Sequence, residues 1–179
     1  MPRALGTSAR LPSLSFVLPN GPGGGTSQHN FSSMRVGDNW IGQVMNALMH
    51  SRDWSSTAVF ITYDDCGCFY DHVPPGRNPD GTVQGIRVPM MIVSPYAKRP
   101  YTDSHPATFA SILRFTEETF GLAPLSLNDR RAYDYRYAFN FAAKPTRARV
   151  AIRQYAVPAS SQRYLASHPT AVAYENDPS

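Results

Sequence analysis

The chain has 179 residues, of which 42% are hydrophobic and 17% are charged, so it can bury a core and is neither a disordered polyelectrolyte nor a fibrous repeat. Its net charge is +4, with five of the 17 basic residues beyond residue 143. Because no helix face carries the clustered Lys and Arg that contact a phosphate backbone, we expect no nucleic-acid partner. No apolar run reaches membrane-spanning or signal-peptide length, which predicts no transmembrane segment and leaves the localisation open.

The N-terminal part predicts a strand, a loop and a helix. Residues 11–18 alternate small or polar residues with apolar ones before Pro19, which is typical of a strand. The Gly-rich stretch at 20–26 lacks the spacing of a phosphate or dinucleotide loop and is interpreted as a flexible turn. A helix is predicted over 37–50 because apolar residues recur there with a period of 3.6, namely Trp40, Ile41, Val44, Met45, Leu48 and Met49.

The central part predicts two buried strands and a second helix. Residues 57–63 and 88–93 are β-branched, aromatic and apolar, as in strands of a parallel sheet. The loop between them, 64–87, is far longer than a usual connection, and such loops are often functional. A helix is predicted over 106–120, with Asp103 or Ser104 as its N-cap and Gly121 as its end.

Together these elements predict an α/β fold, in which a mostly parallel sheet is flanked by helices. Beyond residue 143 the apolar periodicity disappears and prolines are scattered. We therefore expect residues 1–143 to form the domain and residues 144–179 to form an irregular C-terminal tail.

Paired acids are the most informative feature. Asp64 and Asp65 follow directly on the strand predicted at 57–63, and in open α/β sheets ligands bind beyond the carboxyl ends of the strands. Adjacent carboxylates repel each other unless a cation or a shared proton neutralises them, which favours a divalent metal ion. The alternative is a turn with two solvated aspartates.

Other polar residues of the loops are weaker candidates. Asp71 could orient the imidazole of His72, or the two could be a plain surface dipeptide. His29 follows the Gly-rich turn, and we expect it at the same sheet edge as Asp64 if the strands are parallel, although a lone loop histidine is more often idle. Cys66 and Cys68 lack the partners of a zinc site and are interpreted as small loop residues.

Five segments carry a resemblance to a known family. In chain order they are LPSLSFVLPN (11–20), SMRVGDNWIGQVMNAL (33–48), WSSTAVFITYDDCGCFYDHVPP (54–75), GIRVPMMIVSPYA (85–97) and HPATFASILRFTEETFGLAPL (105–125). Over residues 11–141 the chain resembles the C-terminal half of the bacterial phosphoesterase family. That family includes non-haemolytic phospholipases C and acid phosphatases, and it belongs to the alkaline-phosphatase-like superfamily.

The resemblance implies a metal-dependent phosphoesterase that acts on a phosphate ester or a phospholipid. Asp64 and Asp65 would hold the divalent metal ion, and His29 would contact the phosphate or protonate the leaving group. Asp71 and His72 match the family's Asp-His pair and would have a supporting role. Cys66 and Cys68 depart from the glycines common in the family. Family members are often exported.

The resemblance also implies a missing half. Family members carry an N-terminal half with a Glu-Asn metal-ligand pair and a Ser or Thr nucleophile, and nothing before residue 11 supplies either. We therefore expect the chain alone to be inactive and a separate N-terminal half to be a candidate partner. The alternative is a non-catalytic remnant or a binding module.

Overall fold

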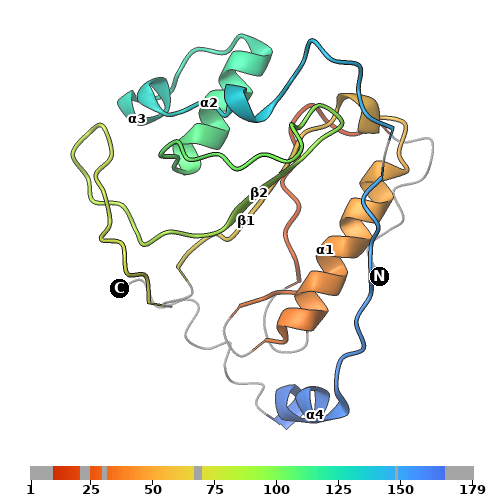
Figure 1. Cartoon of the computed structure of the whole chain (residues 1–179). Helices are drawn as coiled ribbons and strands as arrows, with labels where there is room; N and C mark the ends of the chain where they lie inside the picture. Colours follow the sequence, from red (N-terminus) through yellow and green to blue (C-terminus); the bar gives the residue numbers. More distant parts are fainter. Residues whose placement is uncertain (1–9, 21–24, 30–31, 67–69, 148, 168–179) are drawn as a thin grey trace. The chain divides into compact units, whose positions relative to one another are not determined.

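The protein divides into two compact units. The computed structural model describes residues 10–20, 25–29, 32–66, 70–147 and 149–167. Unit 1 comprises Met1–Trp54 and Arg149–Ser179, and unit 2 comprises Ser55–Ala148 (Figure 1). Helices and strands both occur, which confirms the mixed helix and strand content expected from the sequence. None of the described helices is long and apolar enough to cross a bilayer.

Unit 1 is built on helix α1 (Met34–Met49), which confirms the helix predicted over 37–50. The helix starts earlier than predicted, after the N-cap residue Ser33. Its apolar stripe ends in three buried side chains, Met45, Leu48 and Met49. Burial of one face, rather than the modest helix propensity of its sequence, is therefore what stabilises the helix.

The C-terminal segment is more regular than predicted. Residues 150–156 run along α1, where Asn39 Nδ2 donates to the Tyr155 carbonyl at 2.8 Å and the Tyr155 N–H donates to Asn39 Oδ1 at 2.7 Å. Helix α4 (Ala159–Ser167) follows directly on Pro158. The prediction of an irregular tail is thus wrong for these residues, because a proline at a helix start loses no hydrogen bond and sets the backbone for the first turn.

The strand predicted at 11–18 is wrong. Within the described stretch 10–20 the backbone has no strand pairing, and the side chains of Phe16 and Leu18 are exposed. The Leu11 N–H donates instead to Asp53 Oδ2 at 3.0 Å. Alternating apolar residues form a strand only where a neighbouring strand pairs with them, and the described part of the chain provides none here.

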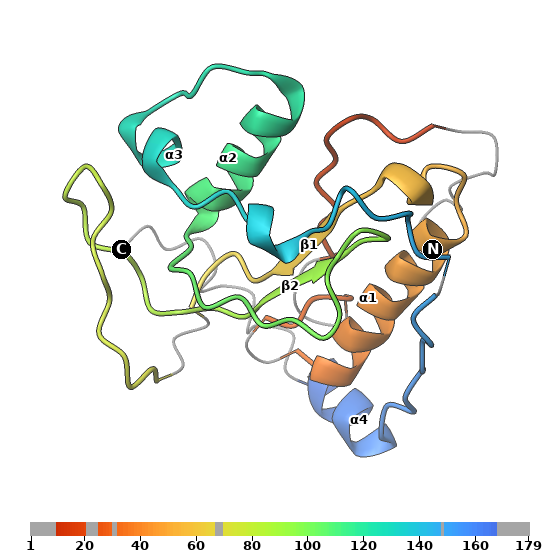
Figure 2. The same ribbon diagram turned by 45° about the horizontal axis from the view of Figure 1, so that its top comes forward.

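Unit 2 contains a two-stranded sheet, formed by β1 (Val59–Thr62) and β2 (Met90–Val93) (Figure 2). Both strands lie inside the predicted ranges, but they are antiparallel, with Val59 opposite Val93 and Thr62 opposite Met90. The prediction of a mostly parallel sheet is therefore wrong for this pair of strands. Parallel neighbours need a crossover, usually a helix, whereas the described part of the connection at 63–89 contains no helix and returns to the end at which β1 stopped.

The core of unit 2 is aromatic. Tyr135, Ala138 and Phe139 are buried, and the side chains that pack on them come from both strands and from α2 (Phe109–Phe120). The Phe139 ring stacks on Phe115 at 5.2 Å between centroids, and Phe60 of β1 meets Phe115 edge-on at 5.0 Å. These rings attach α2 to the sheet, because together they remove a large apolar area from water.

Phe139→Ala is expected to lower the free energy of unfolding by about 3 kcal/mol, since it leaves a cavity among these rings. Phe139 is 4% exposed, whereas the neighbouring Phe141, which also stacks on it, is 60% exposed. Phe141→Ala is the matched control and should cost less than about 1 kcal/mol. Urea unfolding measures both, and equal losses would contradict the assigned core.

Helix α2 ends as predicted but starts later. Gly121 adopts a left-handed conformation with φ 65°, and its N–H donates to the Glu117 carbonyl. The N-cap is Thr108 rather than Asp103 or Ser104, because Thr108 and Ser111 form a reciprocal capping box. A short helix not predicted from the sequence, α3 (Leu127–Arg131), packs beside α2 (Figures 1 and 2).

A buried acid pair joins α2 to α3. Glu117 is 2% exposed and Asp129 is 1% exposed. Burial and the neighbouring Asp129 carboxylate raise the pKa of Glu117. Burial opposes ionisation of Asp129 as well, but hydrogen bonds from Ser126 and from the Leu125 N–H hold the pKa of Asp129 below its usual range. Burial thus favours the protonated form of Glu117, whereas the hydrogen bonds favour the charged form of Asp129.

Glu117→Gln should make the protein less sensitive to alkaline pH. Because the folded-state pKa of Glu117 is raised, its contribution to stability is complete below its unfolded pKa and is lost as the pH rises through the folded value. Glutamine keeps the shape of the buried side chain and has no titrating proton, so the variant should gain stability relative to wild type at mildly alkaline pH. Urea unfolding at acidic and alkaline pH tests this, with the exposed neighbour Glu118→Gln as control; an identical difference at both pH values would refute it.

Candidate active site

Asp64 and Asp65 lie at the start of the loop at 63–89, and hydrogen bonds hold the two ends of this loop together. Thr62 ends β1, and after Tyr63 come Asp64 and Asp65, both exposed. The Thr62 hydroxyl donates to the Pro89 carbonyl at 2.8 Å. The two ends of the loop are therefore held side by side, and the carboxylates leave the sheet at a fixed point.

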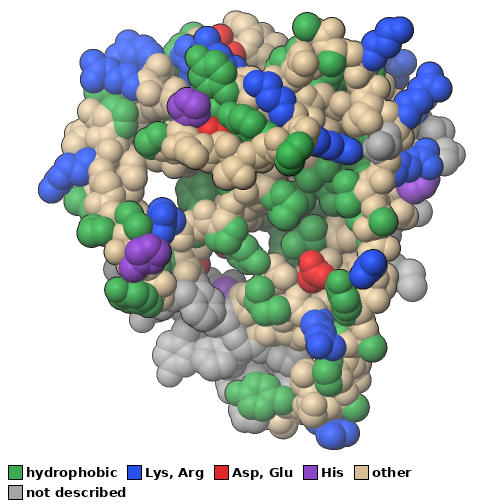
Figure 3. Space-filling model, viewed as in Figure 1, with side chains coloured by type: hydrophobic (Ala, Val, Ile, Leu, Met, Phe, Trp, Pro, Cys, Tyr) green, Lys and Arg blue, Asp and Glu red, His purple; other side chains and the backbone are tan. Residues whose placement is uncertain are grey.

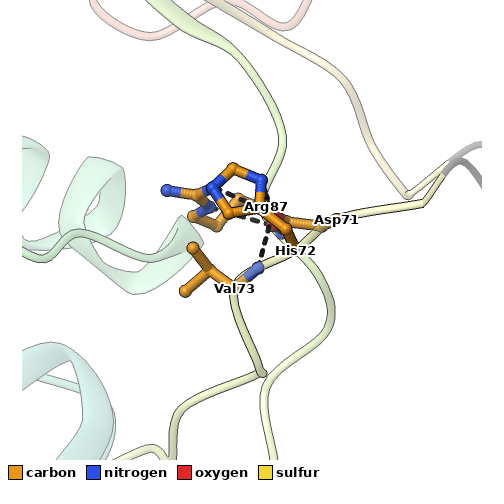
Figure 4. Close-up of polar contacts among 4 residues, drawn as sticks. All are labelled: Asp71, His72, Val73 and Arg87. Atoms are coloured by element: carbon orange, nitrogen blue, oxygen red, sulfur yellow. Dashed lines mark hydrogen bonds and ion pairs between the residues drawn. The ribbon is translucent and has the colours of Figure 1, made fainter.

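Asp71 and Arg87 form a second clasp (Figure 4). The Asp71 side chain is 10% exposed and accepts from Arg87 Nε at 2.9 Å, from Arg87 Nη2 at 2.8 Å and from the Arg87 N–H at 3.1 Å. The Val73 N–H donates to it at 3.0 Å. The Arg87 guanidinium and the Val73 N–H hold the pKa of the Asp71 carboxyl well below its usual range, so Asp71 stabilises the loop except as the pH falls into the acidic range.

His72 lies outside this clasp. Its side chain is 80% exposed, and its Nδ1 is 3.9 Å from Asp71 Oδ1, beyond hydrogen-bond distance. Asp71 thus pairs with Arg87 and makes no hydrogen bond to His72, so it does not orient His72 in the way that the sequence suggested (Figure 4). Arg87 was not predicted as a site residue; it stands in the GIRVPMMIVSPYA segment, but no charge pattern links it to Asp71.

The tip of the loop is attached to α3. Arg77 and Val83 bridge, and the Asp80 carboxylate accepts from the Thr82 hydroxyl and N–H. Asp80 and Asn128 of α3 exchange two hydrogen bonds, of 3.1 and 2.8 Å. The described stretch 70–89 is therefore ordered by polar contacts rather than by a helix or a long strand.

His29 belongs to the other unit. It is half-buried, its N–H donates to Ser27 Oγ at 3.0 Å, and its carbonyl accepts from the Ser32 N–H at 2.9 Å. The structure does not place unit 1 relative to unit 2, so the proximity of His29 to Asp64 stays a prediction. Cys66 is half-buried, and Cys68 lies outside the described residues.

Asp64 and Asp65 are ligands of the type that a divalent cation prefers, but two residues do not complete a metal site. Asp64 and Asp65 offer carboxylate oxygens, which hard cations prefer. Among the described residues, no group of three or more His, Cys, Asp or Glu side chains is placed to share a metal ion.

The sequence did not predict a polar cluster that is formed by residues after β2 in the chain. Asp103 accepts from Tyr133 Oη at 2.6 Å and lies 2.7 Å from His105 Nδ1. The His105 ring stacks on both Tyr133 and Tyr137, at 4.6 and 5.1 Å between centroids, and the two tyrosine rings are 6.4 Å apart. The Asp-Ser-His spacing was a local signal, but the tyrosines come from a distant segment that no pattern connects to it.

Comparison with known proteins identifies the family. The model of the phosphoesterase family matches residues 6–123, which contain all five candidate residues and Arg87. Phospholipase C B of Mycobacterium tuberculosis is 30% identical over 163 residues, which cover 76% of this chain and 31% of the relative.

Two further relatives carry similar names. Non-hemolytic phospholipase C of Burkholderia pseudomallei is 32% identical over 65% of this chain and 21% of the relative. Non-specific phospholipase C1 of Arabidopsis thaliana is 34% identical over 40% of this chain and 16% of the relative. The chain thus spans about a third or less of the length of these relatives. With the family model matching well over half of its residues, the chain belongs to the phosphoesterase family.

Proposed function

We propose that this chain supplies part of the catalytic domain of a metal-dependent phosphoesterase of the phospholipase C or acid phosphatase type. The observation that carries the proposal is the family match across the clasped loop, in which two exposed carboxylates follow β1 directly. The names of the relatives support a phosphate-ester substrate, and a phospholipid in particular.

In this proposal Asp64 and Asp65 hold the divalent metal ion. The bound ion would neutralise charge on the nonbridging oxygens of the phosphate. The hydrogen bond from Thr62 to Pro89 and the ion pair of Asp71 with Arg87 keep the loop ends together, so the two carboxylates need little reordering to bind the ion. The relatives extend far beyond the matched part, and we propose that the remaining ligands and the Ser or Thr nucleophile come from a corresponding N-terminal half.

His29 is proposed as the general acid and His72 as a supporting group. An imidazole titrates near neutral pH and can protonate a leaving alkoxide. Asp71 acts through Arg87, as a positioning residue of the loop. In the completed domain we propose an alkaline-phosphatase-like arrangement in which β1 and β2 form an antiparallel pair of a larger sheet.

Metal binding by the purified chain tests this function. Equilibrium dialysis with Mn²⁺ or Zn²⁺ should detect weak binding that is lost in Asp64→Asn and Asp65→Asn, because each removes a charged ligand. Asp38→Asn, an exposed acid on α1, is the matched control and should bind as wild type does. Equal binding by all variants would favour the non-catalytic remnant or binding module.

A further inference from the structure

Unit 2 carries a basic surface pocket that the proposed function does not use. It has a volume of about 260 Å³ and is lined by α2, α3 and the turn after α3, through Arg114, Arg130, Arg136, Asp134, Tyr133 and Tyr137. Figure 3 shows Lys and Arg side chains gathered over the part of the view in which α2 and α3 lie. Three guanidinium groups and one carboxylate line the pocket, and Glu118, which pairs with Arg114, adds a second carboxylate, so one positive charge is in excess.

Two of the guanidinium groups are fixed in place. Arg136 Nε donates to Asp134 Oδ2 at 2.7 Å, and Arg136 Nη2 contacts the same oxygen. Arg114 pairs with Glu118 one turn along α2. A guanidinium has five N–H donors, so each pair leaves donors for a ligand. The pairs therefore orient these side chains without using up their binding capacity.

Arg130 differs from the other two. It is exposed on α3, and within the described part of the chain its guanidinium has no ion-pair partner. Its charge is compensated by no carboxylate, and its long side chain faces the pocket that Arg114 and Arg136 also line. An anion in the pocket would thus meet the uncompensated charge of Arg130 and the oriented guanidinium groups of Arg114 and Arg136.

The aromatic wall of the pocket is rigid. Tyr133 Oη donates to Asp103, and the ring of His105 stacks on both Tyr133 and Tyr137. The two tyrosines that line the pocket are thus fixed from behind by a stacked imidazole. A preformed wall lowers the ordering cost of binding a small ligand.

We propose that this pocket binds a phosphate monoester group. The planar fork of a guanidinium matches the oxygens of phosphate, and three guanidinium groups on one pocket offer donors to its three terminal oxygens, more than the two oxygens of a carboxylate can accept from. The phosphate can belong to a small phosphorylated molecule or to the headgroup of phosphatidic acid, and the two sources share this chemistry.

The first experiment titrates the full chain with inorganic phosphate at low ionic strength, following the Arg Nε–H resonances by NMR. EDTA is present, so that no cation at Asp64 and Asp65 contributes. Resonances of Arg114, Arg130 and Arg136 should shift together. Arg130→Gln should weaken binding about tenfold, the loss of one charge-assisted contact. Arg131→Gln, its exposed neighbour on α3 outside the pocket, is the control and should bind normally.

The second experiment separates the two sources. Wild type, Arg130→Gln and Arg131→Gln are sedimented with phosphatidic acid vesicles and with phosphatidylcholine vesicles. Binding to phosphatidic acid that Arg130→Gln weakens supports the site with a lipid source, and binding to inorganic phosphate alone supports it with a soluble source. Failure of wild type to bind either ligand, shifts outside the three arginines, or equal losses in both variants would overturn the proposal.

Discussion

Asp64→Asn is expected to abolish metal-dependent hydrolysis in the completed domain, lowering kcat by roughly a thousandfold or more. The carboxylate supplies both charge and an oxygen ligand, and the neutral amide keeps its shape while losing the charge. Loss of the ion would leave the developing charge on the phosphate uncompensated. Steady-state kinetics with p-nitrophenyl phosphate, together with metal content by atomic absorption, measure both effects.

Asp38→Asn is again the matched control, because it removes an exposed carboxylate from α1 and lies outside the proposed site. It should keep the metal content and kcat of the parent enzyme. Unchanged metal content and hydrolysis in Asp64→Asn would contradict the assignment of the acid pair.

His29→Ala is expected to act selectively on substrates with poor leaving groups. A general acid contributes about a hundredfold or more when the departing oxygen needs a proton, and little when a nitrophenolate leaves without one. Alkyl phosphate esters should therefore lose most of their turnover in the variant, while p-nitrophenyl phosphate loses little. Equal losses for both esters would reject the general-acid role while leaving the proximity of His29 to the metal open to a distance measurement.

Local patterns predicted the two longest described helices, α1 and α2, well, missed the shorter α3 and α4, and predicted the pairing of strands poorly. The apolar period that places Met45 and Met49 on one face of α1 acts within the helix, as does the left-handed Gly121 that ends α2. Strand direction depends instead on how the chain returns, and the connection at 63–89 brings it back to Thr62 with no crossover helix among its described residues. The alternation at 11–18 predicted a strand that has no partner here.

The candidate site was likewise predicted only where its residues are neighbours in the sequence. Adjacent carboxylates after a strand are visible in the sequence, and Asp64 and Asp65 do follow β1. The partner of Asp71 is visible only in the structure, because Arg87 lies across the loop and satisfies a carboxylate that the sequence alone would pair with His72. Contacts between distant segments leave no period or spacing by which sequence reasoning can find them.

The central claim is that this chain holds one part of a phosphoesterase site, with Asp64 and Asp65 as its metal ligands. The most direct measurement is hydrolysis of p-nitrophenyl phosphate and p-nitrophenyl phosphorylcholine by the purified chain, with Zn²⁺, Mn²⁺, Mg²⁺ or Ca²⁺, alone and with a family N-terminal half added. We predict no turnover by the chain alone, because the proposed Ser or Thr nucleophile comes from the N-terminal half, and metal-dependent turnover on addition of that half. Metal-dependent turnover by the chain alone, abolished by Asp65→Ala, would contradict this account.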